Sequence, residues 1–318
     1  MAVHSILTEK DIKKILNNYD IGKLISFFGI KDGIENTNYL IRTEVNKFIL
    51  TIFENRVKIS ELPFFYDLMQ NSFNKNINCP TVVERLNGKN SVLFQKKQTS
   101  IFTFLNGKCL KNWNINNCYD VGFMLGKFHN KNKNFKKRIN NHFGIKEWKR
   151  LFSKCKQDIN KILPFEKDFI EKELAFLSKN WPLNSLPKGI IHADLFPDNV
   201  LFENRKISGI IDFYFSCYDF LAYDLAILVN AWCFSKKNFK QGFYENLIKG
   251  YQSVRPLTKN EKKKFNILLR GASMRFLMTR IFDKIHTPKK NNVTIKDPSE
   301  YLFKLKFHQS NNDSDAYF

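Results

Sequence analysis

The sequence lacks most of the short signatures that mark common protein classes. Its six cysteines, at positions 79, 109, 118, 155, 217 and 233, include no C-x-x-C pair and no Cys/His group with zinc spacing. Neither G-x-G-x-x-G nor the phosphate loop G-x-x-x-x-G-K-[ST] occurs. We therefore expect reduced thiols in a cytoplasmic protein that has no zinc site.

Long apolar runs and acidic residues are also scarce. The most apolar stretch, residues 213–234, is interrupted by Asp219 and Asp224, and the first residues, MAVHSILTEKD, contain no apolar signal-peptide core. We expect neither a membrane span nor a signal peptide. Lys and Arg total 52 against 30 Asp and Glu, but the basic groups at 136–138, 262–264 and 289–290 are short and scattered. A nucleic-acid-binding protein gathers such residues on one face, so we expect no nucleic-acid partner and attribute the lysines to an AT-rich genome.

Hydrophobic residues make up 43% of the chain, which is ample for a core. Thr8 and Asp11 predict a capped helix at 8–18. Runs rich in Ile, Val, Phe and Thr predict strands at 22–30, 39–42, 47–53, 81–84, 92–95 and 100–105, with one helix at 57–74. Helical patterns follow at 116–131, 146–163, 166–180 and most of 218–285, around short strands at 189–191, 200–202 and 207–211. The sequence predicts an α+β fold with a small antiparallel-sheet lobe over 1–105 and a larger, mainly α-helical lobe over 106–318.

The strongest signal is a polar loop between apolar runs. His192, Asp194 and Asn199 fit the pattern H-x-D-x-x-x-x-N, and Asp212 follows one predicted hairpin later in the run I-I-D-F. Phosphoryl transfer to a hydroxyl needs one carboxylate to orient the hydroxyl and accept its proton. It also needs an amide oxygen and a second carboxylate to hold magnesium. We predict Asp194 as the base, Asn199 and Asp212 as metal ligands, and His192 as a support of the loop. The alternative, that these acids are only turn residues, is disfavoured by the apolar strands on both sides.

This motif resembles that of the aminoglycoside phosphotransferase-like kinases, which are relatives of the protein kinases. Other stretches resemble the homoserine kinases of that fold, over nearly the whole chain. They are 19–22 (YDIG), 33–39 (GIENTNY), 48–51 (FILT), 62–65 (LPFF), 211–215 (IDFYF), 230–233 (NAWC), 275–280 (RFLMTR) and 297–302 (DPSEYL). The resemblance implies a protein-kinase-like two-lobed fold. It also implies that ATP, with Mg²⁺, phosphorylates the side-chain hydroxyl of L-homoserine, a step towards threonine.

The resemblance further implies where the nucleotide binds. The turn that contains Asn36, Thr37 and Asn38 lies over the phosphates in this superfamily. Thr103 and Leu105 fall in the hinge segment, where the adenine is bound.

One departure concerns the third strand. Protein kinases carry a Lys there that binds the nucleotide phosphates. The matching position here is Thr51, which the homoserine kinases share, so the cation must come from elsewhere. Arg56 and Lys58 are candidates, and Glu61 could pair with either. Solvated surface roles for all three are equally favoured.

Homoserine carries a carboxylate and an ammonium, so its site needs a cation and an acid. The candidate substrate residues are Asp219, Arg275, Arg280, Tyr214 and Trp232. The two arginines are favoured because a guanidinium fork matches a carboxylate, although at five residues apart only one can face a given pocket. The two aromatic residues are also compatible with a buried core. Asp224 matches a superfamily acid that braces the catalytic loop, and we predict a supporting role for it.

Two other interpretations stay open. A sister kinase for aminoglycosides, choline or methylthioribose would share the loop, but the arginines better suit an acceptor that carries a carboxylate. A non-catalytic ATP-binding or nucleic-acid-binding protein is opposed by the presence of Asp194, Asn199 and Asp212 together and by the scattered lysines. The sequence does not indicate an oligomeric state.

Overall fold

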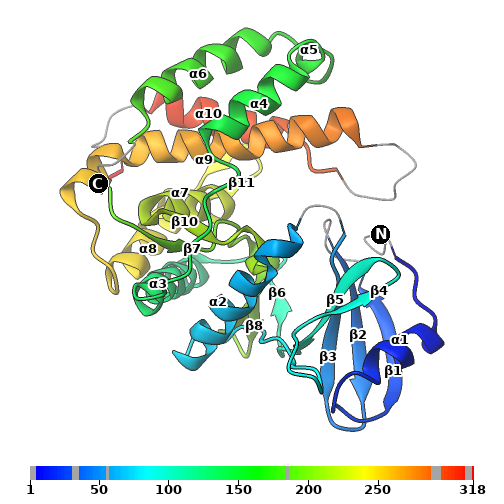
Figure 1. Ribbon diagram of the computed structural model, residues 1–318. Coiled ribbons are helices and arrows are strands. Elements are labelled where there is room, and N and C mark those ends of the chain that lie inside the picture. Colours follow the sequence, from blue (N-terminus) through cyan, green and yellow to red (C-terminus); the bar gives the residue numbers. More distant parts are fainter. Residues whose placement is uncertain (1–4, 31–35, 55–56, 183–185, 288–294, 312–316) are drawn as a thin grey trace. The chain divides into compact units, whose positions relative to one another are not determined.

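The computed structural model describes residues 5–30, 36–54, 57–182, 186–287, 295–311 and 317–318 (Figure 1). Contacts divide them into two compact units. The first contains the described residues of Met1–Gly107 together with Ser208–Tyr214. The second contains Lys108–Ile207 and the described residues of Phe215–Pro288 and Ile295–Phe318. No helix among the described residues is both long and apolar enough to cross a membrane.

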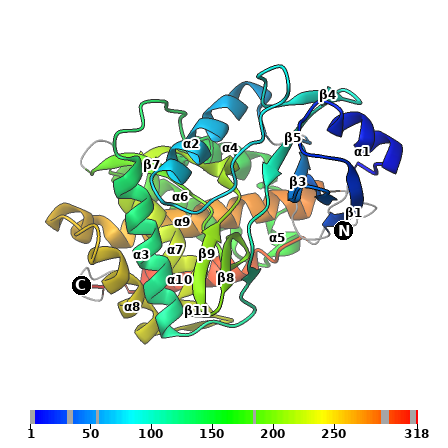
Figure 2. The same cartoon turned by 90° about the horizontal axis from the view of Figure 1, so that it is seen from below.

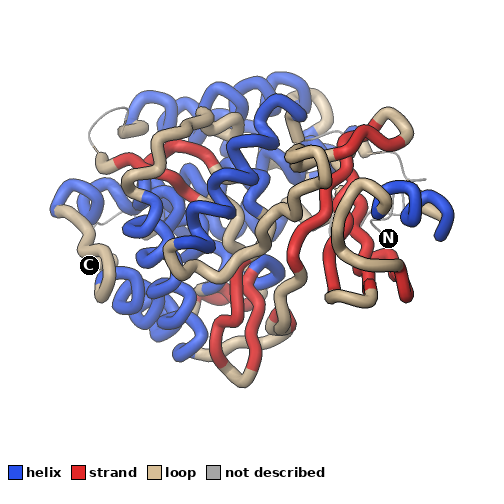
Figure 3. Tube along the Cα trace, turned by 60° about the horizontal axis from the view of Figure 1, so that its bottom comes forward, coloured by secondary structure: helices blue, strands red, loops and turns tan. Residues whose placement is uncertain are grey.

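The first unit is built on a five-stranded antiparallel sheet, whose strands are red in Figure 3. Its strands are β1 (Leu24–Ile30), β2 (Thr37–Thr43), β3 (Lys47–Ile52), β4 (Val92–Phe94) and β5 (Lys97–Thr103), in the order β1-β2-β3-β5-β4. Alternate residues along β2 are buried, as expected for a strand with one face on a core. Ile12 and Ile15 of α1 (Glu9–Leu16) pack in the same apolar cluster as Tyr39, Ile41 and other sheet residues.

Local signals explain the helices of the first unit. Helix α1 begins with the predicted capping box between Thr8 and Asp11. The predicted helix at 57–74 is a short 3₁₀ turn, η1 (Ile59–Glu61), followed by α2 (Leu62–Asn74). The expected strand at 81–84 is absent, and only an isolated bridge joins Val82 to Phe102.

The second unit is mainly helical. Its helices are α3 (Ile115–Asn132), α4 (Ile145–Cys155), α5 (Ile159–Ile162), α6 (Lys167–Asn180), α7 (Leu221–Trp232), α8 (Gln241–Gln252), α9 (Lys259–His286) and α10 (Ser299–Ser310). The long helix α9, orange in Figures 1 and 2, packs against α4, α6, α7 and α10. The predicted α+β class is therefore confirmed.

Short strands accompany these helices. They are β6 (Lys108–Cys109), β7 (Lys188–Ile191), β8 (Val200–Glu203), β9 (Lys206–Ile210), β10 (Cys217–Phe220), β11 (Phe234–Ser235) and β12 (Asn238–Phe239), with 3₁₀ turns η2 (Pro197–Asn199) and η3 (Phe213–Phe215). Strand β7 pairs with β10 in antiparallel register, Gly189 opposite Asp219. Asp219 therefore lies in a strand and not in the helical stretch expected over most of 218–285, because α7 starts only at Leu221. The expected helix at 146–163 is likewise two helices separated by a turn at 156–158.

Helices α3 and α8 approach each other unusually closely, and glycines make this possible. A β-carbon on Gly122 would lie 2.1 Å from the carbonyl oxygen of Leu247, and one on Gly250 would lie 2.0 Å from that of Tyr119. No larger residue fits at either position without separating the helices. His129 lies on α3 and Tyr251 on α8, and their side chains are hydrogen-bonded across this contact.

Candidate active site

The loop that follows β7 is held by one buried carboxylate. Asp224, on α7, accepts hydrogen bonds from the backbone amides of His192 and Ala193, at 2.7 and 2.8 Å. Ala193 has a φ of +64°, a left-handed conformation that non-glycine residues rarely adopt. Two charge-assisted bonds to adjacent amides help to keep the backbone in this conformation immediately before Asp194.

Asp224 has a third partner, His129, whose Nε2 lies 3.0 Å from Oδ2. Both side chains are buried. Burial acts to raise the pKa of Asp224, but the hydrogen bonds from His129 and the His192 amide outweigh it and lower that pKa. Burial lowers the pKa of His129. The pair is therefore an ionised carboxylate and a neutral imidazole.

The loop carbonyls are also bound from the helices. Arg275, on α9, donates from Nη1 to the carbonyl oxygen of Ala193 at 2.8 Å. Trp232, on α7, donates from Nε1 to the carbonyl oxygen of Leu195 at 2.9 Å. Both side chains are buried, so these two predicted substrate residues contact the loop backbone directly.

Inside the loop, Asn199 orients Asp194. The Nδ2 group of Asn199 donates to the carbonyl oxygen and to Oδ2 of Asp194, at 2.7 and 3.1 Å. The buried ring of His192 accepts from the Asp194 amide at Nδ1, 3.3 Å away. Because Nδ2 makes both bonds of Asn199, its amide oxygen is the atom available for a cation. An amide oxygen is one of the hard oxygen donors that Mg²⁺ accepts, so Asn199 fits the role of a magnesium ligand.

Asp212 lies in the first unit, two residues after the end of β9, and has a φ of +65°. The next polar residue, Tyr214, packs its ring against Phe53 and Phe65 at centroid distances of 5.3 and 5.6 Å. Burial raises the pKa of Tyr214 well above its usual value, helped by Tyr66 and Asp212, so its hydroxyl stays protonated.

The position that protein kinases give to a lysine is occupied by a neutral chain of hydrogen bonds. Thr51 donates from its hydroxyl to Oδ1 of Asn38 at 2.7 Å. The Tyr214 hydroxyl hydrogen-bonds to Thr51 in turn.

The other turn residues face a different cluster. Thr37 donates to Oε1 of Glu54 at 2.8 Å, and Ser5 donates to the same oxygen at 2.8 Å. Lys97 forms an ion pair with Glu54. Asn36 accepts from the Glu54 amide at 3.4 Å. The hydroxyl of Thr37 is thus engaged within the first unit, on the strand face opposite to that of Asn38.

The other residues predicted to bind the nucleotide differ in their surroundings. Arg56 lies outside the described residues. Lys58 lies 3.7 Å from Glu61, but its side chain is mostly exposed. At the expected hinge, Thr103 donates its amide to the carbonyl oxygen of Thr81 at 2.9 Å. Leu105 lies against Gly209, where a β-carbon would come within 2.8 Å of its Cδ1.

Two predicted substrate residues have polar partners of their own. Arg280 forms an ion pair with Glu300 at 2.6 Å and donates to the carbonyl oxygen of Asp297 at 3.0 Å. Buried Lys304 pairs with the other oxygen of Glu300. Asp219 accepts from Asn141 at 2.8 Å and from the Phe220 amide at 2.7 Å. Burial raises the pKa of Asp219 although both of these hydrogen bonds oppose the shift.

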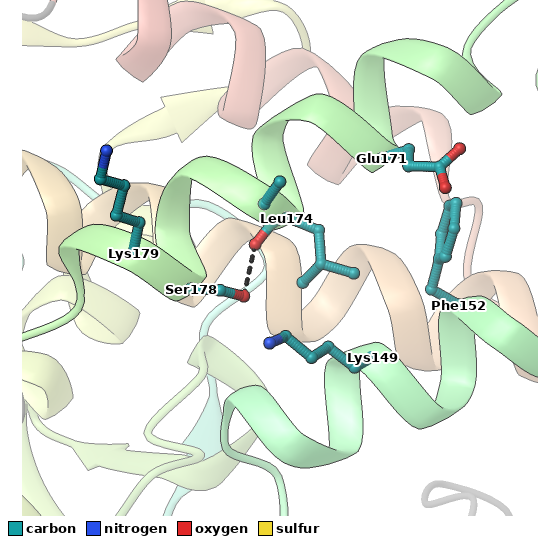
Figure 4. A pocket seen from close by; sticks show the side chains of 7 residues that line it. Lys149, Phe152, Glu171, Leu174, Ser178 and Lys179 are labelled. Atoms are coloured by element: carbon teal, nitrogen blue, oxygen red, sulfur yellow. Dashed lines mark hydrogen bonds between the residues drawn. The ribbon is translucent and has the colours of Figure 1, made fainter.

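A separate groove of about 530 Å³ lies between α4 and α6 (Figure 4). It is lined by Lys149, Phe152, Glu171, Leu174, Ala175, Ser178 and Lys179. None of the residues predicted from the catalytic motif lines it.

The structure adds contacts that sequence reasoning missed. His129 contacts Asp224 from 95 positions away, and no local spacing signals such a contact. Lys296 Nζ lies 3.4 Å from Oδ2 of Asp198, in the loop that contains Asp194. Glu300 belongs to the run DPSEYL that marked the resemblance. Only this last feature carried a signal in the sequence.

Comparison with known proteins decides the family. The model of the phosphotransferase enzyme family matches residues 28–257. The chain belongs to this family. Curated relatives include homoserine kinases of Rhizobium johnstonii, 42% identical over 97% of this chain and 96% of the relative, and of Bartonella henselae, 43% identical over 96% of each. The homoserine kinase of Gluconobacter oxydans is 42% identical over 98% of this chain and 99% of the relative.

Solved structures show the same phosphotransferase fold. A microcompartment-associated aminopropanol kinase matches with a TM-score of 0.75 at 18% identity, over 97% of this chain and 99% of its own. The amicoumacin kinase hAmiN, in complex with AMP-PNP and Ca²⁺, matches with a TM-score of 0.72 at 15% identity, over 97% and 95%. The resemblance drawn from the sequence motifs is therefore confirmed for the family and the fold.

Proposed function

We propose that this chain is a homoserine kinase that transfers the γ-phosphate of ATP to the side-chain hydroxyl of L-homoserine, towards threonine, in the cytoplasm. The observation that carries the proposal is the match to homoserine kinases at about 40% identity over nearly the full chain. The retained loop of Asp194 and Asn199 supports a catalytic role, because a scaffold would not need both.

In the proposed mechanism, Asp194 orients the homoserine hydroxyl and accepts its proton as the oxygen attacks the γ-phosphorus. The new oxygen–phosphorus bond forms while the bond to the β–γ bridging oxygen breaks, and ADP leaves. Asn199 and Asp212 would hold Mg²⁺, which would neutralise charge on the phosphate oxygens. His192 and Asp224 would keep the loop backbone in place during this transfer.

Binding roles follow the sequence predictions. We propose that Asn36, Thr37 and Asn38 lie along the phosphates and that Thr103 and Leu105 flank the adenine; Arg56 is a candidate cation. Arg275 and Arg280 are the two candidate ligands of the homoserine carboxylate, and the kinetics of Arg275→Lys decide between them: a loss of kcat alone leaves Arg280, whereas a rise in KM selects Arg275. Asp219, Tyr214 and Trp232 complete the proposed substrate set.

The test is ADP release with Mg-ATP and a panel of L-homoserine, kanamycin, choline and methylthioribose. Strong stimulation by homoserine alone is expected. Stimulation by another member would keep the kinase chemistry and overturn the acceptor. If no member stimulates turnover, the acceptor assignment fails, and Mg-ATP binding then decides whether the catalytic proposal stands.

A further inference from the structure

A chain of hydrogen bonds extends from Asp224 through residues of α3 and α8 to the first turn of α9. His129 of α3, already bonded to Asp224, places Nδ1 2.9 Å from the hydroxyl of Tyr251 on α8. Arg255 donates from Nη1 to the same hydroxyl oxygen at 3.0 Å. Its Nη2 donates to Glu261, in the first turn of α9, at 2.7 Å. His129, Tyr251 and Glu261 are buried, and the Arg255 side chain is 11% exposed.

The direction of every hydrogen bond in this chain can be derived from Asp224. An ionised carboxylate is an acceptor only, so the proton of His129 must sit on Nε2. Nδ1 then carries a lone pair, and the Tyr251 hydroxyl must donate to it. Burial raises the pKa of Tyr251, which keeps that hydroxyl protonated. Arg255 donates to the remaining lone pair of Tyr251. Each residue from Arg255 through Tyr251 and His129 therefore donates a hydrogen bond to the next, and Asp224 is the final acceptor.

We infer that Tyr251 is a positioning residue for phosphoryl transfer. By donating to Nδ1, it fixes the Nε2–H tautomer of His129. In the other tautomer, a lone pair on Nε2 would face the Asp224 carboxylate and repel it. Asp224 would then hold the His192 and Ala193 amides less firmly, and Asp194 would lose its fixed orientation. Misplacement of a base lowers turnover more than it lowers substrate binding.

The experiment compares two tyrosines on the same helix. Tyr251→Phe removes the hydroxyl that contacts His129. Tyr244→Phe removes an equally buried hydroxyl, which instead donates to the carbonyl oxygen of Tyr317 at 2.7 Å. With homoserine and Mg-ATP, Tyr251→Phe should lower kcat about tenfold, with both KM values within about twofold. Tyr244→Phe should leave kcat unchanged, although it too lowers the melting temperature.

The kinetic arm rests on the proposed function, so a second readout does not use the substrate. Imidazole ¹⁵N spectra of the wild-type protein should report the Nε2–H tautomer for His129 and a tautomer mixture in Tyr251→Phe. If Tyr251→Phe does not fold, Arg255→Gln should show the same direction of change in both readouts, less strongly. Equal kcat values for the two Phe variants, or an Nδ1–H tautomer in the wild type, would overturn the inference. Wild-type protein without homoserine turnover would instead count against the proposed function, and the spectra would still decide.

Discussion

Arg275 reaches the carbonyl oxygen of Ala193 from inside the core, with Nη1 2.8 Å away and only 2% of the residue exposed. The rings of Phe143, Phe215 and Phe276 surround its guanidinium, with centroids at 4.7 to 5.4 Å. Among the described residues it makes no ion pair with a carboxylate. A buried guanidinium without a carboxylate partner is stabilised by the aromatic rings around it and by the carbonyl oxygen to which it donates.

Arg275→Lys should therefore lower kcat at least about tenfold while the KM for homoserine changes by about twofold or less, because lysine lacks the planar fork. Steady-state kinetics measures both. Arg270→Lys is the matched control, since Arg270 is buried on the same helix but pairs with Glu173 at 2.6 Å. It should lose stability without losing kcat. A large rise in KM at constant kcat would instead assign the homoserine carboxylate to Arg275.

Asp194→Asn should reduce kcat by about 10²–10⁴-fold, because the hydroxyl loses its proton acceptor. Nucleotide binding, measured by calorimetry, should be nearly unchanged, since Asn199 would keep the hydrogen bond from its Nδ2 to the backbone carbonyl oxygen of residue 194. Undiminished turnover would remove Asp194 from the proposed mechanism.

Asp212→Asn should weaken magnesium-dependent nucleotide binding, because a metal ligand changes from a carboxylate to a neutral amide. Titration of ATP with and without Mg²⁺ measures the effect. Asp20→Asn serves as the control because Asp20 is an exposed carboxylate of the same unit. Equal ATP affinities for the two variants in Mg²⁺ would show that Asp212 does not hold the metal.

Much of the fold was predictable because its signals are local. The capping box at Thr8 and the alternating strand β2 depend on residues a few positions apart. The assignment of Asp219 to a helix failed because the partner of β10 is β7, a strand far away in sequence. Within the site, Asp194 and Asn199 were predicted from the spacing of the motif H-x-D-x-x-x-x-N. The support from Tyr251 could not be predicted, because packing alone brings it to His129.

Gly122→Ala should destabilise the protein by about 1–3 kcal/mol, since the new methyl group would overlap the carbonyl oxygen of Leu247. Gly242→Ala, in the first turn of α8, meets its nearest neighbour only at 4.0 Å. It should stabilise the helix by up to about 1 kcal/mol. Denaturant unfolding of both variants tests these opposite signs. A neutral Gly122→Ala would mean that α3 and α8 can separate at little cost.

His308 should make stability depend on pH. Its Nε2 lies 2.7 Å from Oδ1 of Asn230, and burial, with the charges of Lys304 and Arg270, lowers its pKa from 6.5 to about 3. His308 is therefore protonated near pH 6.5 in the unfolded chain but only near pH 3 in the folded protein. The contribution is fully present above pH 6.5 and is lost as the pH falls, by up to about 1.4 kcal/mol per pH unit.

Denaturant unfolding between about pH 6 and pH 4 measures this slope. His308→Gln should be less stable at neutral pH but should show a flatter pH dependence than the wild type. Parallel curves for the two proteins would place the acid sensitivity at other groups.

Glu261 serves two structures at once. One oxygen accepts from the amide of Thr258 at 2.9 Å and closes the capping box of α9, while the other binds Arg255 at 2.7 Å. The connection between α8 and α9 is therefore fixed in length. An insertion between residues 255 and 258 would disrupt both the capping box of α9 and the hydrogen bonds that connect Glu261 through Arg255 and Tyr251 to His129. For anyone engineering this enzyme, that connection is a poor site for a tag, a circular permutation or a fused domain.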